Sequence, residues 1–186
     1  MKAEMSIETD QAVITTERFV LRPPRLSDVG LLAHYSGDKR VASETRSIPH
    51  PLVPGSTEAF VNRALQPDRI EDVWVMDGTG EGGDEGRGHE VLGIISLTRM
   101  DRNQSQLGYW VAPPFWNTGL ASEAVQALIA ANPLDNDALF AEVFQDNPNS
   151  ARVLTGAGFE YVGDSEAFSV ARDATVATWT YCRKMR

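Results

Sequence analysis

The chain has 186 residues, of which 42% are hydrophobic, and this is enough apolar material for the core of one domain. Its formal net charge of −9 disfavours broad electrostatic attraction to nucleic acid or to an anionic membrane. The single cysteine, Cys182, excludes an internal disulfide and a zinc site built on several thiolates. No apolar run approaches the length of a membrane span, and the N-terminus lacks the apolar core of a secretion signal. We therefore expect a single-domain cytoplasmic protein that binds neither nucleic acid nor membrane and holds no metal ion.

The N-terminal part of the chain predicts a strand followed by a helix. Residues 1–11 are polar and are expected to form a flexible tail, which leaves 12–186 for the domain. A strand is predicted within 14–21, and Ser27 or Asp28 is expected to begin the helix after it. The apolar side of this helix is expected to comprise Val29, Leu31, Leu32 and Tyr35.

A second helix and a hairpin are predicted after a proline-rich loop. Ser56 or Thr57 is expected to cap the helix, and strands are predicted at 73–76 and 91–97. Between these strands, residues 77–90 include six glycines and five acidic residues without an apolar anchor, so we expect a mobile loop. A phosphate-binding role for the glycines is disfavoured, because the carboxylates would repel a phosphate.

The centre of the chain reads as strand, turn and helix. A strand is predicted over 107–111 and a helix over 120–131, with two consecutive prolines between them. Asn117 or Thr118 is expected to cap the helix, and the small residue Gly119 leaves main-chain N–H groups of its first turn uncovered. These donors and the helix dipole predict a site for a phosphate or pyrophosphate, although many turns of this kind bind nothing.

The C-terminal part predicts a strand at 138–144, a short helix capped by Asn147 or Asn149, and final strands at 159–162 and 176–182. The order of elements implies an α+β fold of three layers. Its mixed, mostly antiparallel sheet is expected to have about seven strands flanked by four helices. The strand, helix and strand around the anion site form a central βαβ unit.

Three segments share their order and spacing with a known family. They read TERFVLRPPRLSDVGLLAHY from residue 16, LGYWVAPPFWNTGLASEAVQALI from residue 107, and DNPNSARVLTGAGFEYVG from residue 146. Together they resemble the GNAT superfamily of N-acetyltransferases, and in particular its RimJ/RimL-like branch of ribosomal-protein acetyltransferases. The resemblance covers most of residues 14–183.

The resemblance implies an acetyl-CoA site at the central strand and helix. Trp116 takes the place where most of the family has Gln or Arg, as is usual in this branch. The strand at 108–112 is expected to part from 140–144 and admit pantetheine, and Gly108 favours a bulged strand whose pairing ends early. An ordinary interior strand is the alternative. Cofactor binding is thereby assigned to Tyr109, Trp110, Val111, Trp116, Asn117, Thr118, Gly119, Leu120, Ala121 and Asn147.

The resemblance also implies direct attack of an amine on the thioester, without a covalent enzyme intermediate. Many members protonate the departing thiolate with a tyrosine, but Leu154 occupies that position and cannot donate. Ser150, where the RimL-like branch places its candidate acid, is assigned as donor to the CoA sulfur, with Asn147 as a hydrogen-bonding partner. Both residues are equally suited to helix capping without catalysis. Cys182 is expected to pack in a strand and not to act as a nucleophile.

The sequence offers more than one candidate for the general base. Related sequences often carry Glu at the catalytic position occupied here by Gln106, and a carboxamide cannot usefully accept a proton at neutral pH. Either a water relay removes the proton, or it is accepted by Asp101 or by a residue of the loop that borders the acceptor pocket, where Glu44 and His50 lie. Each of the three is also suited to an ordinary solvated position. Glu44 and His50 are the predicted acceptor-binding residues.

We therefore expect an acetyl-CoA-dependent N-acetyltransferase that acts as a monomer or homodimer on a primary amine. The amine is expected to be a protein N-terminus or a small molecule. Because Gln106 replaces a carboxylate, a catalytically degenerate acyl-CoA-binding sensor is the alternative. A generic interaction domain is a third possibility.

Overall fold

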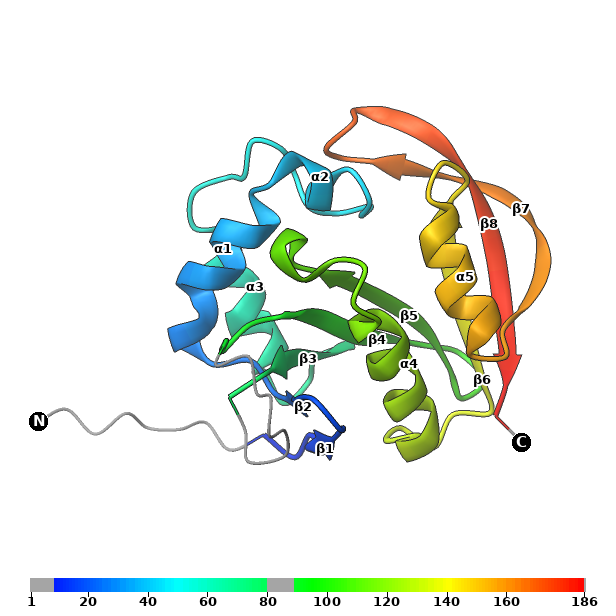
Figure 1. The fold of residues 1–186 in the computed structure, drawn as a ribbon, viewed down its shortest axis with the longest axis horizontal. Helices are drawn as coiled ribbons and strands as arrows, with labels where there is room; N and C mark the ends of the chain where they lie inside the picture. The colour runs from blue at the N-terminus through cyan, green and yellow to red at the C-terminus, as the bar shows by residue number, and fades with distance from the viewer. Residues whose placement is uncertain (1–8, 80–88, 186) are drawn as a thin grey trace, which may run out of the picture.

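A computed structural model of the chain describes residues 9–79 and 89–185, within which it forms one eight-stranded sheet and five α-helices (Figure 1). The strands are β1 (Ile14–Thr15), β2 (Val20–Arg22), β3 (Glu71–Asp77), β4 (Gly93–Met100), β5 (Gln104–Val111), β6 (Ala138–Phe144), β7 (Glu160–Ser169) and β8 (Ala174–Lys184). The helices are α1 (Val29–Ser36), α2 (Lys39–Ala42), α3 (Ser56–Ala64), α4 (Leu120–Ala131) and α5 (Pro148–Gly156), with short 3-10 helices η1 (Leu26–Asp28) and η2 (Pro113–Phe115).

The sheet is mixed and mostly antiparallel, as predicted. Its strand order is β1-β2-β3-β4-β5-β6-β8-β7. β5 and β6 run parallel and are connected by α4, which confirms the central βαβ unit, and the other neighbours are antiparallel. The numbers of strands and helices each exceed the prediction by one. The first predicted strand divides into β1 and β2, and α2 forms within the predicted proline-rich loop.

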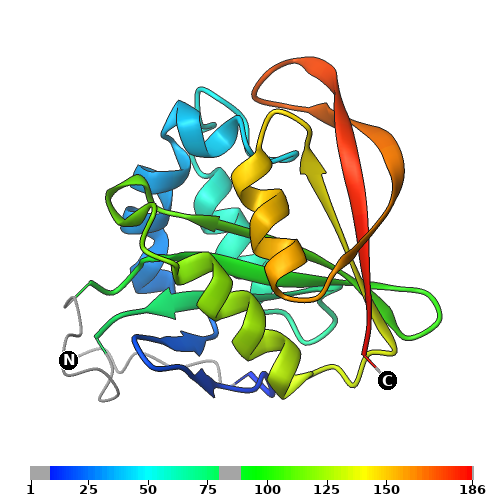
Figure 2. The same ribbon diagram turned by 45° about the vertical axis from the view of Figure 1, so that its right-hand side comes forward.

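Helices cover both faces of the sheet and produce the predicted three layers. On one face α4 and α5 contribute Leu120, Val125 and Leu154 to the larger apolar core. On the other, α1 and α3 contribute Leu32 and Val61 to a smaller core. Figure 2 shows α4 and α5 crossing the sheet on the near side, with α1 and α3 behind it. The apolar residues of α4 recur at helical spacing, and this side of the helix packs into the larger core.

The ordered domain begins earlier than predicted. Gln11, expected in a flexible tail, is buried, and its side-chain amide donates to the Val73 carbonyl at 2.6 Å. Residues 1–8 of that predicted tail lie outside the described residues. So do residues 80–88 of the loop predicted at 77–90.

Three local predictions are corrected. Gly55, with φ 80°, precedes α3, so Ser56 is its first residue and neither Ser56 nor Thr57 is its cap. In α1 the buried stripe passes through Leu32 and leaves Leu31 37% exposed. β7 extends seven residues beyond its predicted end, to Ser169, because an edge strand needs no apolar pattern on its solvent side.

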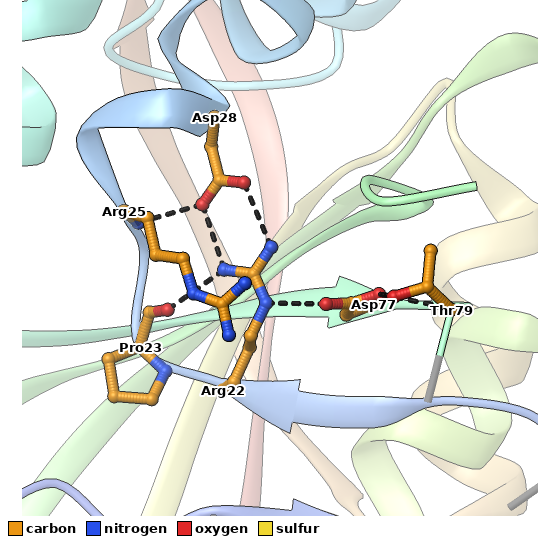
Figure 3. Close-up of polar contacts among 6 residues, drawn as sticks. All are labelled: Arg22, Pro23, Arg25, Asp28, Asp77 and Thr79. Carbon is orange, nitrogen blue, oxygen red and sulfur yellow. Dashed lines mark hydrogen bonds and ion pairs between the residues drawn. The ribbon is translucent and has the colours of Figure 1, made fainter. Parts of the chain in front are cut away.

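A buried ion-pair network joins β2, η1 and β3 (Figure 3). The Arg22 guanidinium donates to Asp28 at 2.8 and 2.9 Å and to Asp77 at 2.6 Å. Burial alone would raise the pKa of Asp77, but hydrogen bonds from Arg22 and Thr79 hold that pKa below its ordinary value of 3.8. The stability contributed by this carboxylate is therefore fully present above pH 3.8 and is lost as the pH falls through the lower folded-state pKa.

Replacing Asp28 tests this network. Asp28→Ala is expected to lower the free energy of unfolding by about 3–5 kcal/mol, because it leaves the buried Arg22 charge partly unpaired. Urea denaturation measures the change. Asp10→Ala is the matched control, since the Asp10 side chain is 90% exposed in its pair with Arg69, and its loss should change the free energy of unfolding far less than the loss of Asp28. Equal effects of the two substitutions would contradict a special role for the buried network.

Candidate active site

β5 and β6 part in the middle of the sheet. Their parallel pairing ends at Leu107, opposite Ala141. Beyond that point β5 continues to Val111 paired with β4, and β6 continues to Phe144 paired with β8. The parting of these strands is as predicted. The register of β5 against β4 is regular over its whole length, so the predicted bulge at Gly108 is wrong.

The gap exposes main-chain groups of β5. The N–H of Ala112 donates to the Leu92 carbonyl, and this fixes the alternation of the antiparallel ladder between β5 and β4. Trp110 consequently directs its main-chain groups to β4. Tyr109 and Val111 direct theirs away from β4 and into the gap. The predicted pairing with an incoming ligand is therefore available at Tyr109 and Val111, and Trp110 can contribute only its side chain.

The loop before α4 has the conformation of an anion site. Asn117 and Gly119 have φ of 60° and 79°, and alternation of this kind turns successive N–H groups to one side. No side chain caps α4, and the Thr118 hydroxyl instead donates to the Phe115 carbonyl at 2.5 Å. The predicted capping by Asn117 or Thr118 is therefore wrong. Because Gly119 provides no side-chain cap, the N–H groups of the first turn of α4 are available to a ligand.

Trp116 closes one end of the exposed strand. Its indole N–H donates to the Val111 carbonyl at 2.6 Å, and the Arg40 guanidinium lies 5.3 Å from the centre of its ring. This hydrogen bond makes the Val111 carbonyl unavailable to a ligand. The N–H of Val111 and both main-chain groups of Tyr109 remain directed into the gap.

The hydroxyls of Tyr109 and Ser150 meet at this gap, 2.7 Å apart. Ser150 is in the first turn of α5, whose predicted cap is confirmed, since the Asn147 side chain accepts from the Ser150 N–H at 3.3 Å. Burial raises the pKa of Tyr109 to about 12, although the Ser150 hydrogen bond acts in the opposite direction. The phenol thus keeps its proton at neutral pH. When it donates to Ser150, the serine proton is free for a ligand.

The sequence analysis assigned Tyr109 to cofactor binding, but it gave no role to the hydroxyl of this residue, which meets Ser150. Leu154, one turn after Ser150 in α5, is completely buried. The hydroxyl that reaches the first turn of α5 is that of Tyr109, in β5.

A cavity of about 660 Å³ adjoins the gap. Its walls come from α1, α3, the loop after α2 and the central strands. The residues at the gap include Gly108, Tyr109, Phe144, Asn147 and Ser150. Gln106 lies in the wall, paired in register with Thr98 of β4. The catalytic position predicted for Gln106 is therefore in the cavity, but its carboxamide is not a base.

Glu44 is a cavity carboxylate close to the start of α5, where its side chain interacts with that of Asn147. Arg172 lies 4.0 Å from Glu44, and also donates to the Ser43 carbonyl at 2.8 Å and to Asp146 at 2.6 Å. Arg172 belongs to the turn between β7 and β8, which reaches over to α2 in Figure 1. Burial is the main cause that raises the pKa of Glu44. Asp146 acts in the same direction, and Arg172 and the Asn147 side chain act against it.

The other two predicted bases lie elsewhere. His50 is not among the residues that line the cavity, and it is close enough to Asp38 to affect the pKa of that carboxyl. Asp101 is exposed in the turn between β4 and β5, at the end of β5 remote from Val111. Of the three candidates, the structure brings Glu44 to the cavity, and the predicted acceptor-binding role of His50 has no support in this geometry.

Glu142 also lines the cavity, as does Glu71, and the sequence analysis included neither of them. The Glu142 side chain, in β6, is 14% exposed and accepts from the Thr178 hydroxyl at 2.6 Å and from Arg46 at 2.9 Å. A charged residue inside the apolar run ALFAEVF was the signal available in the sequence. Because both of its oxygens are engaged, Glu142 is better suited to fixing the cavity wall than to accepting a proton.

A main-chain edge open beside an uncapped helix start fits an acyl-CoA, whose pantetheine carries amides and whose nucleotide end carries a pyrophosphate. Comparison with known proteins identifies the family. The chain matches the acetyltransferase (GNAT) domain over residues 18–160. It therefore belongs to the GNAT family, as predicted, and is an acetyl-CoA-dependent N-acetyltransferase.

Individual relatives align with almost the whole chain. An uncharacterized N-acetyltransferase p20 of Bacillus licheniformis is 24% identical and covers 89% of this chain and 92% of its own. A solved GNAT acetyltransferase from Bacillus anthracis superposes with a TM-score of 0.74 at 19% identity, covering 94% and 99% of the two chains. RimL, a ribosomal L7/L12 alpha-N-protein acetyltransferase solved with coenzyme A, gives 0.76 at 18% identity, covering 93% and 98%. These structural similarities concern the fold.

In the described ranges, 9–79 and 89–185, no helix has both the length and the apolar character to cross a bilayer. In the same ranges, no three or more His, Cys, Asp or Glu side chains are grouped so that they could hold a metal ion.

Proposed function

We propose that the protein transfers the acetyl group of acetyl-CoA to a primary amine by direct attack within a ternary complex. The observation that supports this proposal is the parting of strands β5 and β6. Pantetheine enters between them and pairs with the main chain of Tyr109 and Val111, and its pyrophosphate binds at residues 117–121. The amine enters through the cavity between α1, α3 and the sheet, so that both substrates meet beside Ser150.

The reaction requires that the nitrogen lone pair attack the thioester carbonyl carbon. As the N–C bond forms, the nitrogen becomes acidic, and Glu44 accepts its proton directly or through a water molecule. Its raised pKa makes Glu44 a better proton acceptor than an ordinary surface carboxylate. The C–S bond then breaks and the thiolate departs. The acceptor is a protein N-terminal amine or a small-molecule amine, and an α-amine, with a pKa of about 7.7–8.0, demands least of the base.

Ser150 assists the departure of the thiolate by donating a hydrogen bond to the sulfur, with Tyr109 donating to Ser150 in turn. Complete proton transfer from a phenol with a pKa of about 12 to a thiolate with a pKa of about 8.5 would be uphill by roughly 5 kcal/mol. The pair is therefore assigned to stabilising the developing negative charge. The released thiolate takes its proton from water.

A thiol-release assay tests the proposed function. Acetyl-CoA is incubated with a panel of peptide α-amines, polyamines and other small amines, and free CoA is detected as it forms. Turnover that depends on a primary amine is expected. Tight binding of acetyl-CoA by calorimetry without turnover on any acceptor would contradict the proposal and would support a sensor.

Ser150→Ala is expected to lower kcat roughly a hundredfold, because one donor to the developing charge is lost. The dissociation constant of acetyl-CoA should change much less, since the main-chain contacts of β5 and of the loop that precedes α4 remain. Steady-state kinetics and calorimetry on the same preparation separate the two effects. An unchanged kcat would remove Ser150 from the mechanism.

A further inference from the structure

Arg18, in the turn between β1 and β2, is fixed against the loop that precedes α4. Its Nη1 donates to the Thr118 carbonyl at 2.7 Å. Its Nε and main-chain N–H donate to the two carboxylate oxygens of Glu123 at 2.6 and 2.9 Å. A Cβ atom placed on Gly119 would lie 3.5 Å from its Nη2. The Arg18 guanidinium is therefore held directly beside the residue that opens α4.

The bond to Thr118 determines where the next N–H points. In a trans peptide the carbonyl and the following N–H point in opposite directions. Because the Thr118 carbonyl is turned toward Arg18, the N–H of Gly119 is turned away from it. Gly119 has φ 79°, and α4 has no side-chain cap. Arg18 thus holds this peptide in the orientation that offers its N–H to an anion.

Arg18 also balances a charge that would oppose an anion. Glu123 is in the first turn of α4. Burial acts to raise the pKa of Glu123, but the hydrogen bonds from Arg18 outweigh it and hold that pKa below its ordinary value. The carboxylate is therefore ionised at neutral pH, and without a partner it would repel a phosphate group at the same helix end.

We propose that Arg18 is a positioning residue of the cofactor site, which orients the Thr118–Gly119 peptide toward the pyrophosphate of acetyl-CoA and neutralises Glu123. The inference rests on the proposed function, which places the pyrophosphate at the start of α4. It adds to the site a residue that precedes Thr118 by 100 positions and does not itself need to touch the ligand.

Arg18→Gln tests the inference through two thioesters. Acetyl-CoA carries the pyrophosphate, and S-acetylpantetheine carries the same reacting group without it. The KM for acetyl-CoA is expected to rise roughly ten- to a hundredfold with little change in kcat, because the loop amides are misplaced. kcat/KM for S-acetylpantetheine is expected to stay at its wild-type value. Arg102→Gln is the matched control: it makes the same substitution at an exposed arginine in the turn between β4 and β5, so its KM for acetyl-CoA should be unchanged.

Equal losses with both thioesters would show that Arg18 supports only the fold, and would overturn the inference. A wild-type KM for acetyl-CoA in Arg18→Gln would also overturn it, while acetyl transfer by the wild-type protein would leave the proposed function standing. If the wild-type protein turns over no amine, the proposed function fails. Calorimetric affinity for acetyl-CoA then tests Arg18 by the same comparison of variants.

Discussion

Gly119→Glu is expected to weaken acetyl-CoA binding by at least about a hundredfold. The substitution forces a side chain onto a residue with φ 79° at the start of α4. It also adds a negative charge close to the proposed pyrophosphate position and next to Arg18, whose Nη2 would lie 3.5 Å from the new Cβ atom. Two unit charges about 5 Å apart repel by roughly 3 kcal/mol at an effective dielectric constant of 20, which corresponds to about two orders of magnitude in affinity. Calorimetry with acetyl-CoA measures the change.

The control for this variant is Gly30→Glu, which adds the same side chain in α1, where a Cβ atom meets nothing within 4 Å. It is expected to bind acetyl-CoA as the wild-type protein does. Wild-type affinity in Gly119→Glu would refute the placement of the pyrophosphate.

Glu44→Gln is expected to lower kcat/KM for the acceptor by roughly 10²–10⁴-fold, the usual contribution of a general base. Because only the ionised carboxylate accepts a proton, wild-type activity should fall as the pH drops through the raised pKa of Glu44, above its ordinary value of 4.5. Glu44→Gln should lack this acidic limb. The measurement is the pH dependence of kcat/KM at saturating acetyl-CoA.

Two further variants make the pH experiment specific. Arg172→Gln removes a cation that lowers the pKa of Glu44, so the acidic limb should move to higher pH. Glu58→Gln removes an exposed carboxylate of α3 that does not line the cavity and should leave the profile unchanged. An unaltered profile in Glu44→Gln would exclude Glu44 as the base and favour a water relay.

The parts of the site that follow from local pattern were predictable from the sequence. The apolar residues of 107–111 and 120–131 predict β5 and α4, and the two prolines between them predict where β5 ends. The βαβ unit and the anion loop follow from that order. Helix caps were less predictable: Ser56 and Thr118 are favoured cap residues, but a glycine with positive φ takes the cap position at both helices.

The remaining site groups depend on contacts between distant residues. Tyr109 and Ser150 are 41 positions apart, and Glu142 and Thr178 are 36 positions apart. No periodicity or motif relates such pairs, because strand register and helix packing bring them together only in the folded chain. The direction in which a loop side chain points cannot be derived from local sequence either. Glu44 and His50 lie in one loop, and only the folded structure shows that Glu44 faces the cavity.

The central claim is that free amides at the start of α4, beside the gap between β5 and β6, bind acetyl-CoA. A crystal structure of the protein with acetyl-CoA tests it most directly. The expected result is a pyrophosphate within hydrogen-bonding distance of the N–H groups of 117–121, pantetheine paired with the main chain of Tyr109, and the sulfur beside Ser150. A pyrophosphate bound elsewhere, or β5 and β6 closed into a continuous pair without room for pantetheine, would contradict the claim.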